Sequence, residues 1–185
     1  MPAPLLSRDA VVDRLLGAFR RYGYAAASLG ELSKATGLGR SSLYHYFPGG
    51  KEEMARAVFD RVDQWAQEAV FAPIRGTGTP ERRLSQVIAA LDTYYAGGAE
   101  ACLLGNLVVG DARTLFQDKL SAAFHQLMDG LAQLAREKGI PERDAQQRAE
   151  DAVVRIQGAL IVSRGISDPA PFRRVLKRLP QNLLG

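Results

Sequence analysis

The sequence predicts an all-α protein of about nine helices. Apolar residues recur at the three- and four-residue spacing of amphipathic helices along nearly the whole chain. Alternating β-branched runs bounded by turns, which are typical of strands, do not occur in the sequence; the nearest, residues 103–109, is short and lies among helical segments. The 185 residues are 46% hydrophobic and 24% charged, as in a globular protein with one core and room for a small second domain.

Two helix signals open the chain. Ser7 is a suitable N-cap for a first helix with one apolar face, which we expect to end near Gly23. Ser28, followed three residues later by Glu31, forms a capping box that begins a second helix of about eight residues. Gly37 is expected to end this helix, because glycine takes the positive φ of a helix C-terminus without strain.

A turn that contains glycine leads into the later helices. A third helix is expected over residues 40–47, and Pro48 stops it before a long helix over residues 51–72. The segment 75–83 contains two glycines and a proline and is expected to be a loop. Glycine and proline then separate the remaining helices, which are expected at residues 80–97, 100–110, 113–138, 141–164 and 169–179.

Composition and motifs exclude several classes of protein. One cysteine, Cys102, cannot form an intrachain disulfide, and two distant histidines leave no cluster with metal-ligand spacing. Neither a phosphate-binding loop nor a nucleophile elbow nor a metalloprotease motif occurs, so no enzymatic activity and no cofactor are expected. Charged residues interrupt the apolar N-terminus and no transmembrane run follows, so we expect a cytoplasmic protein without membrane contact. The net charge of +4 permits an anionic partner but identifies none.

Residues 28–47 have the spacing of a helix-turn-helix, which is two short helices joined by a turn of about three residues. In that motif the second helix enters the major groove of DNA, and the first crosses the DNA backbone. From spacing alone, ordinary packing of two short helices is the more frequent explanation, and spacing together with the outward-facing residue types makes DNA binding an equal alternative. The residues expected to face inward are Leu29, Leu32, Ala35, Leu38, Leu43 and Phe47.

The outward-facing residues of the third helix suit DNA. An arginine such as Arg40 can form two hydrogen bonds with guanine O6 and N7, and hydroxyl groups can donate to phosphate. Lys51 stands at the N-terminus of the following helix, where backbone N–H groups already favour a phosphate. The other residues expected to project outward are Ser41, Ser42, Tyr44 and His45.

The stretch from Ser7 to about Val62 resembles the DNA-binding domain of the TetR family of bacterial transcriptional repressors. The residues that carry the resemblance are Ala18-Phe19, Gly23-Tyr24, Ser28, Leu32, Ala35, Gly37, the string Leu43-Tyr44-His45-Tyr46-Phe47, and Lys51-Glu52-Glu53-Met54. The resemblance implies that Arg40, Ser41 and Ser42 read bases. It also implies that Tyr44 and His45 lie near sugar, phosphate or thymine methyl groups. Lys51 would bind a phosphate, and Ser28 would cap the helix that meets the DNA backbone.

Members of that family are homodimers, and the C-terminal helices offer a surface for one. The predicted helix 141–164 is apolar around more of its circumference than a lone surface helix buries. Two copies would place two recognition helices about one DNA turn apart, so the expected operator is palindromic double-stranded DNA. The alternative is that these residues form the core of one chain. The expected interface residues are Val154, Leu160, Ile161, Phe172 and Leu176.

The C-terminal part also holds candidates for binding a small-molecule effector, whose identity the sequence leaves open. Residues 100–107, Glu-Ala-Cys-Leu-Leu-Gly-Asn-Leu, resemble the Gly-Cys-Leu-Leu-Gly-Asn-Leu segment of a TetR branch that includes electrophile and oxidant sensors. A thiolate at Cys102 would add to an α,β-unsaturated carbonyl or be oxidised to sulfenic acid. The alternatives are a buried structural cysteine and aromatic residues that belong to the core. The candidate ligand or sensor residues are Cys102, Trp65, Tyr94, Tyr95, Phe116 and His125.

We therefore expect a DNA-binding helix-turn-helix domain over residues 1–50 and a helical effector-binding and dimerisation domain over residues 51–185. The expected function is a transcriptional repressor that releases its operator when a small molecule or electrophile binds the second domain. Two alternatives remain, a DNA-binding protein without an effector and a helical module that binds another protein. Strong salt dependence of binding would favour DNA, because neutralised phosphates release counterions.

Overall fold

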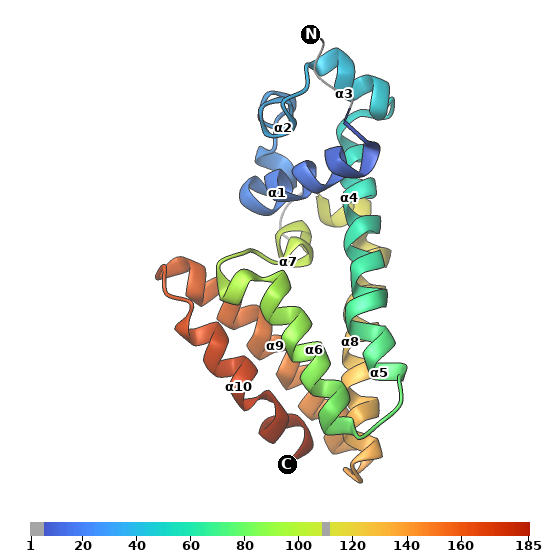
Figure 1. Cartoon of the computed structure of the whole chain (residues 1–185), viewed down its shortest axis with the longest axis vertical. Coiled ribbons are helices and arrows are strands. Elements are labelled where there is room, and N and C mark those ends of the chain that lie inside the picture. Colours follow the sequence, from blue (N-terminus) through green and yellow to red (C-terminus); the bar gives the residue numbers. More distant parts are fainter. Residues whose placement is uncertain (1–5, 109–111) are drawn as a thin grey trace. The chain divides into compact units, whose positions relative to one another are not determined.

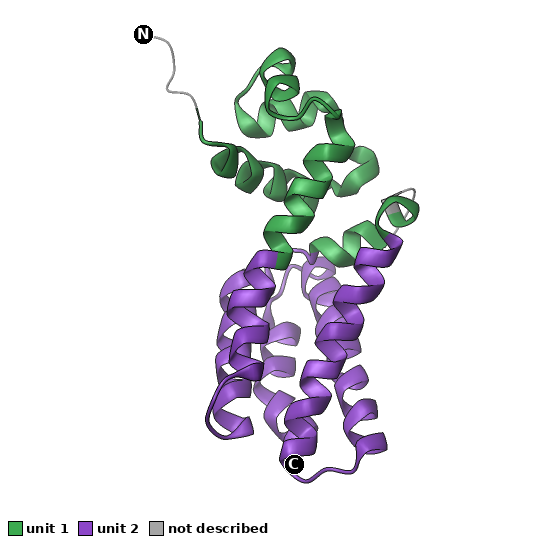
Figure 2. Ribbon diagram, turned by 90° about the vertical axis from the view of Figure 1, so that its right-hand side faces the viewer, with its two compact units in different colours: residues 1–63, 103–116 green, residues 64–102, 117–185 purple. Residues whose placement is uncertain are grey.

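A computed structural model describes residues 6–108 and 112–185, and every regular element within these two ranges is a helix (Figure 1). The chain divides into two compact units (Figure 2). Unit 1 comprises Met1–Asp63 and Leu103–Phe116, and unit 2 comprises Gln64–Cys102 and Gln117–Gly185. The boundary expected at residue 50 therefore falls inside unit 1, and the chain returns to unit 1 after Cys102.

Unit 1 contains the N-terminal helices and a later segment of the chain. The Ser7 hydroxyl accepts a hydrogen bond from the Ala10 N–H at 3.2 Å, which confirms the first predicted N-cap. Gly23 has a φ of 71° and a ψ of 174°, so the helical path breaks where the first helix was expected to end, although α1 continues to Ala26. The helices are α1 (Arg8–Ala26), α2 (Leu29–Thr36), α3 (Arg40–Tyr46), α7 (Leu103–Val108), and the first parts of α4 (Gly50–Ala66) and α8 (Ala112–Glu137).

Each helix of unit 1 contributes at least one large apolar side chain to a common core. These side chains are at most 2% exposed, and burying one of them contributes about 1.5–3 kcal/mol to folding. Short helices such as α2 and α3 are marginal in isolation, so this packing is what holds them in place. The buried residues are Val11, Leu15, Phe19, Leu32, Leu43, Met54, Val58, Leu103, Leu107 and Phe116.

Unit 2 contains the remaining helices. The elements α4, η1 and α5 follow one another without an interruption, so we treat them as one helix. The two described ranges then contain nine helices besides the short η2, as predicted. No helix within these ranges is both long and apolar enough to cross a lipid bilayer. The elements are the π-helical turn η1 (Gln67–Phe71), α5 (Ala72–Arg75), α6 (Pro80–Tyr94), the 3-10 turn η2 (Ala96–Gly98), α9 (Glu142–Gly165), α10 (Ala170–Leu184), and the ends of α4 and α8.

Helix α10 packs against both α9 and α6. At one end of the α9–α10 pair the Ser163 hydroxyl accepts from the Phe172 N–H at 3.1 Å, and at the other end the Arg148 guanidinium donates to the Gly185 carbonyl. These two contacts make α9 and α10 antiparallel neighbours. Their facing side chains and those of α6 and α8 form the core, which includes Leu84, Leu91, Leu131, Leu134, Ile156, Leu160, Phe172 and Leu176.

Several helix ends differ from the prediction, among them those of α6, α7 and α10. Helix α6 ends at Tyr94 rather than at residue 97, because Ala96, Gly97 and Gly98 all adopt positive φ values that leave the α-helical path. Helix α10 continues through Pro180 to Leu184, where burial of the last two leucines offsets the missing backbone hydrogen bond of proline. Helix α7 begins at Leu103 rather than at residue 100, and the expected end at residue 110 lies outside the described residues.

Candidate nucleic-acid interface

Helices α2 and α3 form the predicted helix-turn-helix. The Ser28 hydroxyl accepts from the Glu31 N–H at 3.2 Å and so caps α2, as expected. Gly37 ends α2 with a φ of 72°, in the left-handed region that glycine adopts without strain. Residues 37–39 form the turn, and α3 begins at Arg40. The two helices pack against each other and α2 packs on α1, so α1 supports the motif from behind.

A polar network within the turn fixes the angle between α2 and α3. The Thr36 hydroxyl donates to the Leu32 carbonyl at 2.8 Å and accepts from the Leu38 N–H at 3.3 Å. The Ser33 hydroxyl donates to the Leu38 carbonyl, and the Arg14 guanidinium of α1 donates to the Thr36 carbonyl. These side-chain bonds satisfy backbone groups that a three-residue turn would otherwise leave unpaired.

The expected inward-facing set is right for the deepest positions and wrong for one. Leu32, Leu43 and Phe47 are completely buried, and Leu29 and Leu38 are half-buried. Ala35 is exposed, and the neighbouring Thr36 takes the buried place instead. A buried threonine is tolerated there because its hydroxyl is satisfied by the backbone of its own helix.

The predicted DNA-binding residues of α3 make up its exposed face, which extends over about half of the helix circumference. Arg40, Ser41, Ser42 and His45 are exposed, and Tyr44 is 45% exposed although it is a large aromatic residue. Within the described part of the chain neither a hydrogen bond nor an ion pair holds the Arg40 guanidinium, so its five donors are available to a ligand. Because Leu43 points into the core of unit 1, this exposed face lies on the other side of α3.

Lys51 lies near α3 but is directed elsewhere. Its Nζ donates to the Ala25 carbonyl at 3.1 Å and lies 4.6 Å from the centroid of the Tyr24 ring. Partial burial lowers the pKa of the Lys51 ammonium below its ordinary value. In this conformation Lys51 ties the start of α4 to the end of α1, an arrangement that sequence reasoning did not predict.

Four of the six predicted ligand or sensor residues come together in unit 2. The rings of Trp65 and Tyr94 stack with centroids 3.7 Å apart, and the Tyr95 ring meets Tyr94 edge-on at 5.0 Å. The Tyr95 hydroxyl lies 3.5 Å from the Cys102 Sγ and donates to it. Cys102 itself is only 7% exposed. The cluster is thus a continuous series of aromatic rings that ends at the single thiol.

The other two predicted ligand residues do not belong to this cluster. Phe116 is a correction: it lies in unit 1, where its ring stacks on Phe59 at 6.0 Å and meets Tyr24 edge-on at 6.3 Å. The helical period of α8 turns this ring into the core of unit 1, where it is 1% exposed. His125 is exposed on α8, with its Nδ1 2.8 Å from the Ser121 carbonyl oxygen of the preceding turn.

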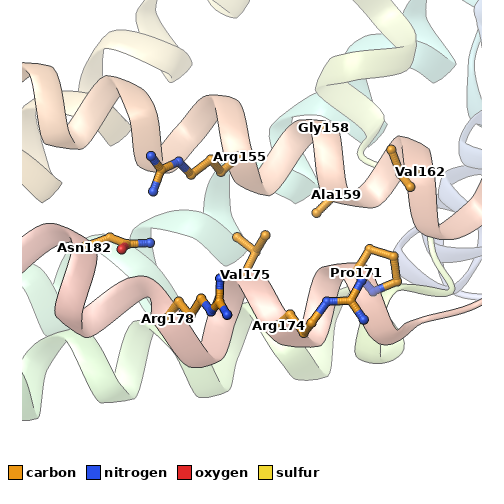
Figure 3. Close-up of a pocket in the computed structure, with 9 residues that line it drawn as sticks. All are labelled: Arg155, Gly158, Ala159, Val162, Pro171, Arg174, Val175, Arg178 and Asn182. Atoms are coloured by element: carbon orange, nitrogen blue, oxygen red, sulfur yellow. The ribbon is translucent and has the colours of Figure 1, made fainter.

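A groove of about 580 Å³ runs between α9 and α10 (Figure 3). Its lining mixes small apolar side chains with three arginines, Arg155 from α9 and Arg174 and Arg178 from α10. Next to it α9 exposes two apolar residues to an unusual extent, Val154 at 63% and Ile161 at 73%. Val154 and Ile161 are seven positions apart, so they lie on one apolar surface of α9.

Only part of the predicted dimer interface lies on that surface. Val154 and Ile161 are exposed, as an interface with a second chain requires. Leu160, Phe172 and Leu176 are a correction, because each is at most 4% exposed and packs inside unit 2. Helix α10 covers the Leu160 side of α9 in the same chain, so these three residues serve the protomer's own core.

Comparisons with known proteins match an N-terminal and a C-terminal part of the chain separately. Residues 12–58 match the model of bacterial regulatory proteins, tetR family, and residues 80–178 match that of the transcriptional regulator LmrA/YxaF-like C-terminal domain. The chain is 20% identical over 181 residues to the HTH-type transcriptional regulator LmrA of Bacillus subtilis, with 96% of each chain covered.

Solved structures with the same fold include the regulatory protein TetR from Rhodobacter sphaeroides. It superposes with a TM-score of 0.80 and 22% identity, over 96% of this chain and 99% of that one. A cysteine mutant of the TetR family transcriptional regulator CifR, complexed with a 26-bp double-strand operator DNA, superposes with a TM-score of 0.72 and 16% identity over 98% of each chain.

Proposed function

The chain belongs to the TetR family of bacterial transcriptional regulators and carries an LmrA/YxaF-like C-terminal domain, and we propose that it is a repressor that releases its operator when a small molecule binds unit 2. It is a DNA-binding regulator, so its place of action is the chromosome and we assign it to the cytoplasm. The proposal gives the chain no catalytic role. Its four parts are DNA reading by α3, a homodimer formed through α9, an effector site near Cys102, and two states of different operator affinity.

The exposed face of α3 is the observation that carries the DNA-reading part. Arg40 stands in the first turn, where a recognition helix contacts base edges, and it is available to pair with guanine. Ser41, Ser42 and the Tyr44 hydroxyl can donate to phosphate, and His45 lies next to them on the same face. Buried Leu43 and Phe47 hold α3 in a fixed orientation, so presenting its exposed face costs little ordering entropy on binding.

Operator binding by variants of α3 tests this part. A duplex selected from a random library serves as operator, and fluorescence anisotropy gives its dissociation constant at several salt concentrations. Arg40→Ala removes one bidentate contact per half-site, so the loss is about 1–3 kcal/mol in each of two half-sites. The matched control is Arg82→Ala, an exposed arginine of unit 2. Wild-type affinity in Arg40→Ala, or equal losses in the two variants, would contradict the assignment.

Charge along α9 supports a homodimer in which the two copies of this helix run antiparallel. Residues 142–153 contain four acidic and two basic side chains, whereas residues 154–165 contain two basic and none acidic. The halves therefore carry −2 and +2, and an antiparallel pair sets each against its complement. Asp151 and Arg164 are both exposed and lie seven and six positions on either side of Gly158.

Gly158 is a suitable crossing point for the two helices. It is exposed, and nothing within 4 Å would meet a side chain there, so a second helix can approach its backbone closely. A twofold axis near Gly158 sets Val154 against the partner copy of Ile161 and Asp151 against the partner copy of Arg164. This arrangement buries the two most exposed apolar side chains of α9 and pairs opposite charges.

Charge reversal tests the antiparallel arrangement. Asp151→Arg and Arg164→Asp each place like charges opposite one another twice per dimer, so each weakens dimerisation in sedimentation equilibrium. The double variant restores the pair in reversed order and recovers most of the wild-type constant. A double variant as weak as the sum of its two components would contradict this register.

For the effector we propose a site beside the cluster of Trp65, Tyr94, Tyr95 and Cys102. Ligand sites are lined mainly by aromatic and apolar groups with a few polar ones, and this cluster offers both a phenol hydroxyl and a thiol. An electrophile that alkylates Cys102 would separate the thiol from the Tyr95 hydroxyl. Treatment with N-ethylmaleimide should therefore release the operator from the wild-type protein but not from Cys102→Ser. Equal release from both proteins would remove Cys102 from the sensing site.

A further inference from the structure

The groove between α9 and α10 is separate from the exposed face of α3 and from the aromatic cluster around Cys102. Its volume of about 580 Å³ is within the usual range of small-molecule sites, which is about 300–1,000 Å³. A second hollow of about 140 Å³ adjoins it, because Arg155, Val175 and Asn182 line both. The recess is therefore large enough for a small molecule, and it shares no residue with either of those two sites.

The lining of the groove is strongly basic. None of its nine residues is acidic, and three of them are Arg155, Arg174 and Arg178. In the described part of the chain neither Arg174 nor Arg178 has an ion pair or a side-chain hydrogen bond. Arg155 has only Asp151 of its own helix, at 3.8 Å. Arg174 and Arg178 are four positions apart on one face of α10, where like charges repel each other. A bound anion would relieve this repulsion, so the lining favours a negatively charged ligand.

The excess positive charge of the whole chain is concentrated at this end of the sequence. Residues 152–185 contain six basic side chains and one acidic one, whereas residues 1–151 contain 18 basic and 19 acidic side chains. The two parts therefore carry net charges of +5 and −1. Because acidic neighbours do not balance the arginines of α10, the potential at the groove attracts anions from solution.

The groove also has a polar end and an apolar end. Figure 3 shows Arg155 and Asn182 toward one end, and Val162 and Pro171 toward the other. Val162 is 49% exposed, although it is a large apolar side chain. A ligand with a charged head and an apolar body matches this division, because it pairs with the guanidinium groups and covers the valine. The remaining apolar lining residues are small, namely Gly158, Ala159 and Val175.

The distance between the two ends limits the size of the ligand. Arg155 and Val162 are seven positions apart on one continuous helix, which corresponds to about 10 Å along its axis. An alkyl chain of medium length, such as that of octanoate, spans this distance. The lining residues include no aromatic side chain, so the groove offers no ring on which a nucleic-acid base could stack.

We propose that the groove between α9 and α10 binds a small amphiphilic anion, which is a carboxylate or a phosphate monoester with an apolar body of medium length. Arg155, Arg178 and Asn182 hold the oxyanion, because guanidinium groups form paired hydrogen bonds with carboxylate and phosphate oxygens. The apolar body lies along the groove toward Val162 and Pro171. This site goes beyond the proposed function, and its existence does not depend on DNA binding.

The site lies beside the proposed contact between two copies of α9. Arg155 and Val162 each follow a residue of the exposed apolar surface, Val154 and Ile161, by one position, so they point about 100° away from that surface around the helix. Gly158, which has no side chain, is assigned to both places. The ligand can therefore bind to a dimer, and we expect one molecule per chain.

Equilibrium dialysis of the full chain with octanoate tests the proposal. We expect one bound molecule per chain at protein concentrations below and above the dimer dissociation constant. Octan-1-ol has the chain without the charge, and acetate has the charge without the chain, so each should bind at least about tenfold more weakly than octanoate. Octyl phosphate identifies the head group. Tighter binding than octanoate assigns the site to phosphate monoesters, and weaker binding assigns it to carboxylates.

Single substitutions locate the bound molecule. Arg178→Gln removes a charge-assisted contact and should weaken octanoate binding about tenfold. Val162→Asp places a like charge beside the bound anion and should weaken binding as well. The matched control is Lys177→Gln, an exposed cation of α10 outside the lining, whose loss should change the affinity less than about twofold. All three positions are on the surface, and circular dichroism checks that the variants fold.

Four results would overturn the proposal. Octan-1-ol that binds as tightly as octanoate would show that the arginines contribute nothing. Equal losses in Arg178→Gln and Lys177→Gln would show a general effect of charge, or binding elsewhere in unit 2. Octanoate binding that disappears when the chain dimerises would mean that a second copy fills the groove. Displacement of octanoate by a random DNA duplex would assign the groove to nucleic acid instead.

Discussion

Replacement of Ile161 by aspartate tests the homodimer at its most exposed apolar position. The side chain is 73% exposed in the single chain, and full burial of an isoleucine is worth about 1.5–3 kcal/mol. A second copy would therefore gain about 1–2 kcal/mol by covering it. Twofold symmetry counts every interface residue twice, so the loss per dimer is about 2–4 kcal/mol before the cost of desolvating the new carboxylates. This corresponds to a dimer dissociation constant raised about 30- to 700-fold.

The assay is sedimentation equilibrium or mass photometry over a concentration series that spans the wild-type constant. Because Ile161 makes few contacts within its own chain, the helical circular dichroism of the monomer should stay unchanged, since surface changes rarely exceed about 0.5 kcal/mol. Leu115→Asp is the matched control, an exposed apolar residue of α8 in unit 1. An Ile161→Asp protein that dimerises with the wild-type constant would refute the assignment of α9 as the interface.

Three further predictions concern folding of the two units. Leu43→Ala, at a completely buried position of α3, should lower the free energy of unfolding by about 2–5 kcal/mol in urea titration, and an effect under 1 kcal/mol would be inconsistent with its burial. Gly98→Ala should lower the free energy of unfolding by about 2–5 kcal/mol in the same assay, because φ is +106° and the added Cβ would lie 2.8 Å from Phe172 Cβ. An unchanged free energy of unfolding would contradict that geometry. Hydrogen bonds from Arg83 lower the pKa of Glu137, so this carboxylate stabilises the folded state above its unfolded pKa and loses that contribution as pH falls through the folded pKa. Glu137→Gln should therefore weaken the decrease of the thermal unfolding temperature at acid pH. A decrease as large as in the wild type would show that the ion pair with Arg83 contributes nothing.

Much of the fold follows from patterns that act over a few residues. The caps at Ser7 and Ser28 and the turn at Gly37 depend on side chains or backbone preferences within one helical turn, so sequence alone locates them. One inward-facing residue of α2 was predicted wrongly, because hydropathy favours alanine over threonine as a core residue. Thr36 is buried since its hydroxyl bonds to the Leu32 carbonyl, a compensation that hydropathy does not reveal.

The limits of sequence reasoning appear where distant segments meet. Helix α9 is apolar on more than one side, and only the position of α10 decides that Leu160 faces the core while Ile161 faces outward. The same is true of Phe116, whose role depends on the return of the chain to unit 1 after Cys102. The hydrogen bond from Lys51 to the Ala25 carbonyl depends on how the end of α1 and the start of α4 pack together. These are long-range contacts, which periodicity cannot encode.

A hydroxyl-radical footprint on the selected operator tests the central claim most directly. Two copies of α3, each presenting Arg40, should protect two half-sites related by a twofold axis and separated by a whole number of helical turns of about 10 base pairs. Protection of both half-sites should disappear together in Arg40→Ala while the protein stays dimeric. A single protected patch without symmetry, or protection that Arg40→Ala leaves intact, would contradict the account.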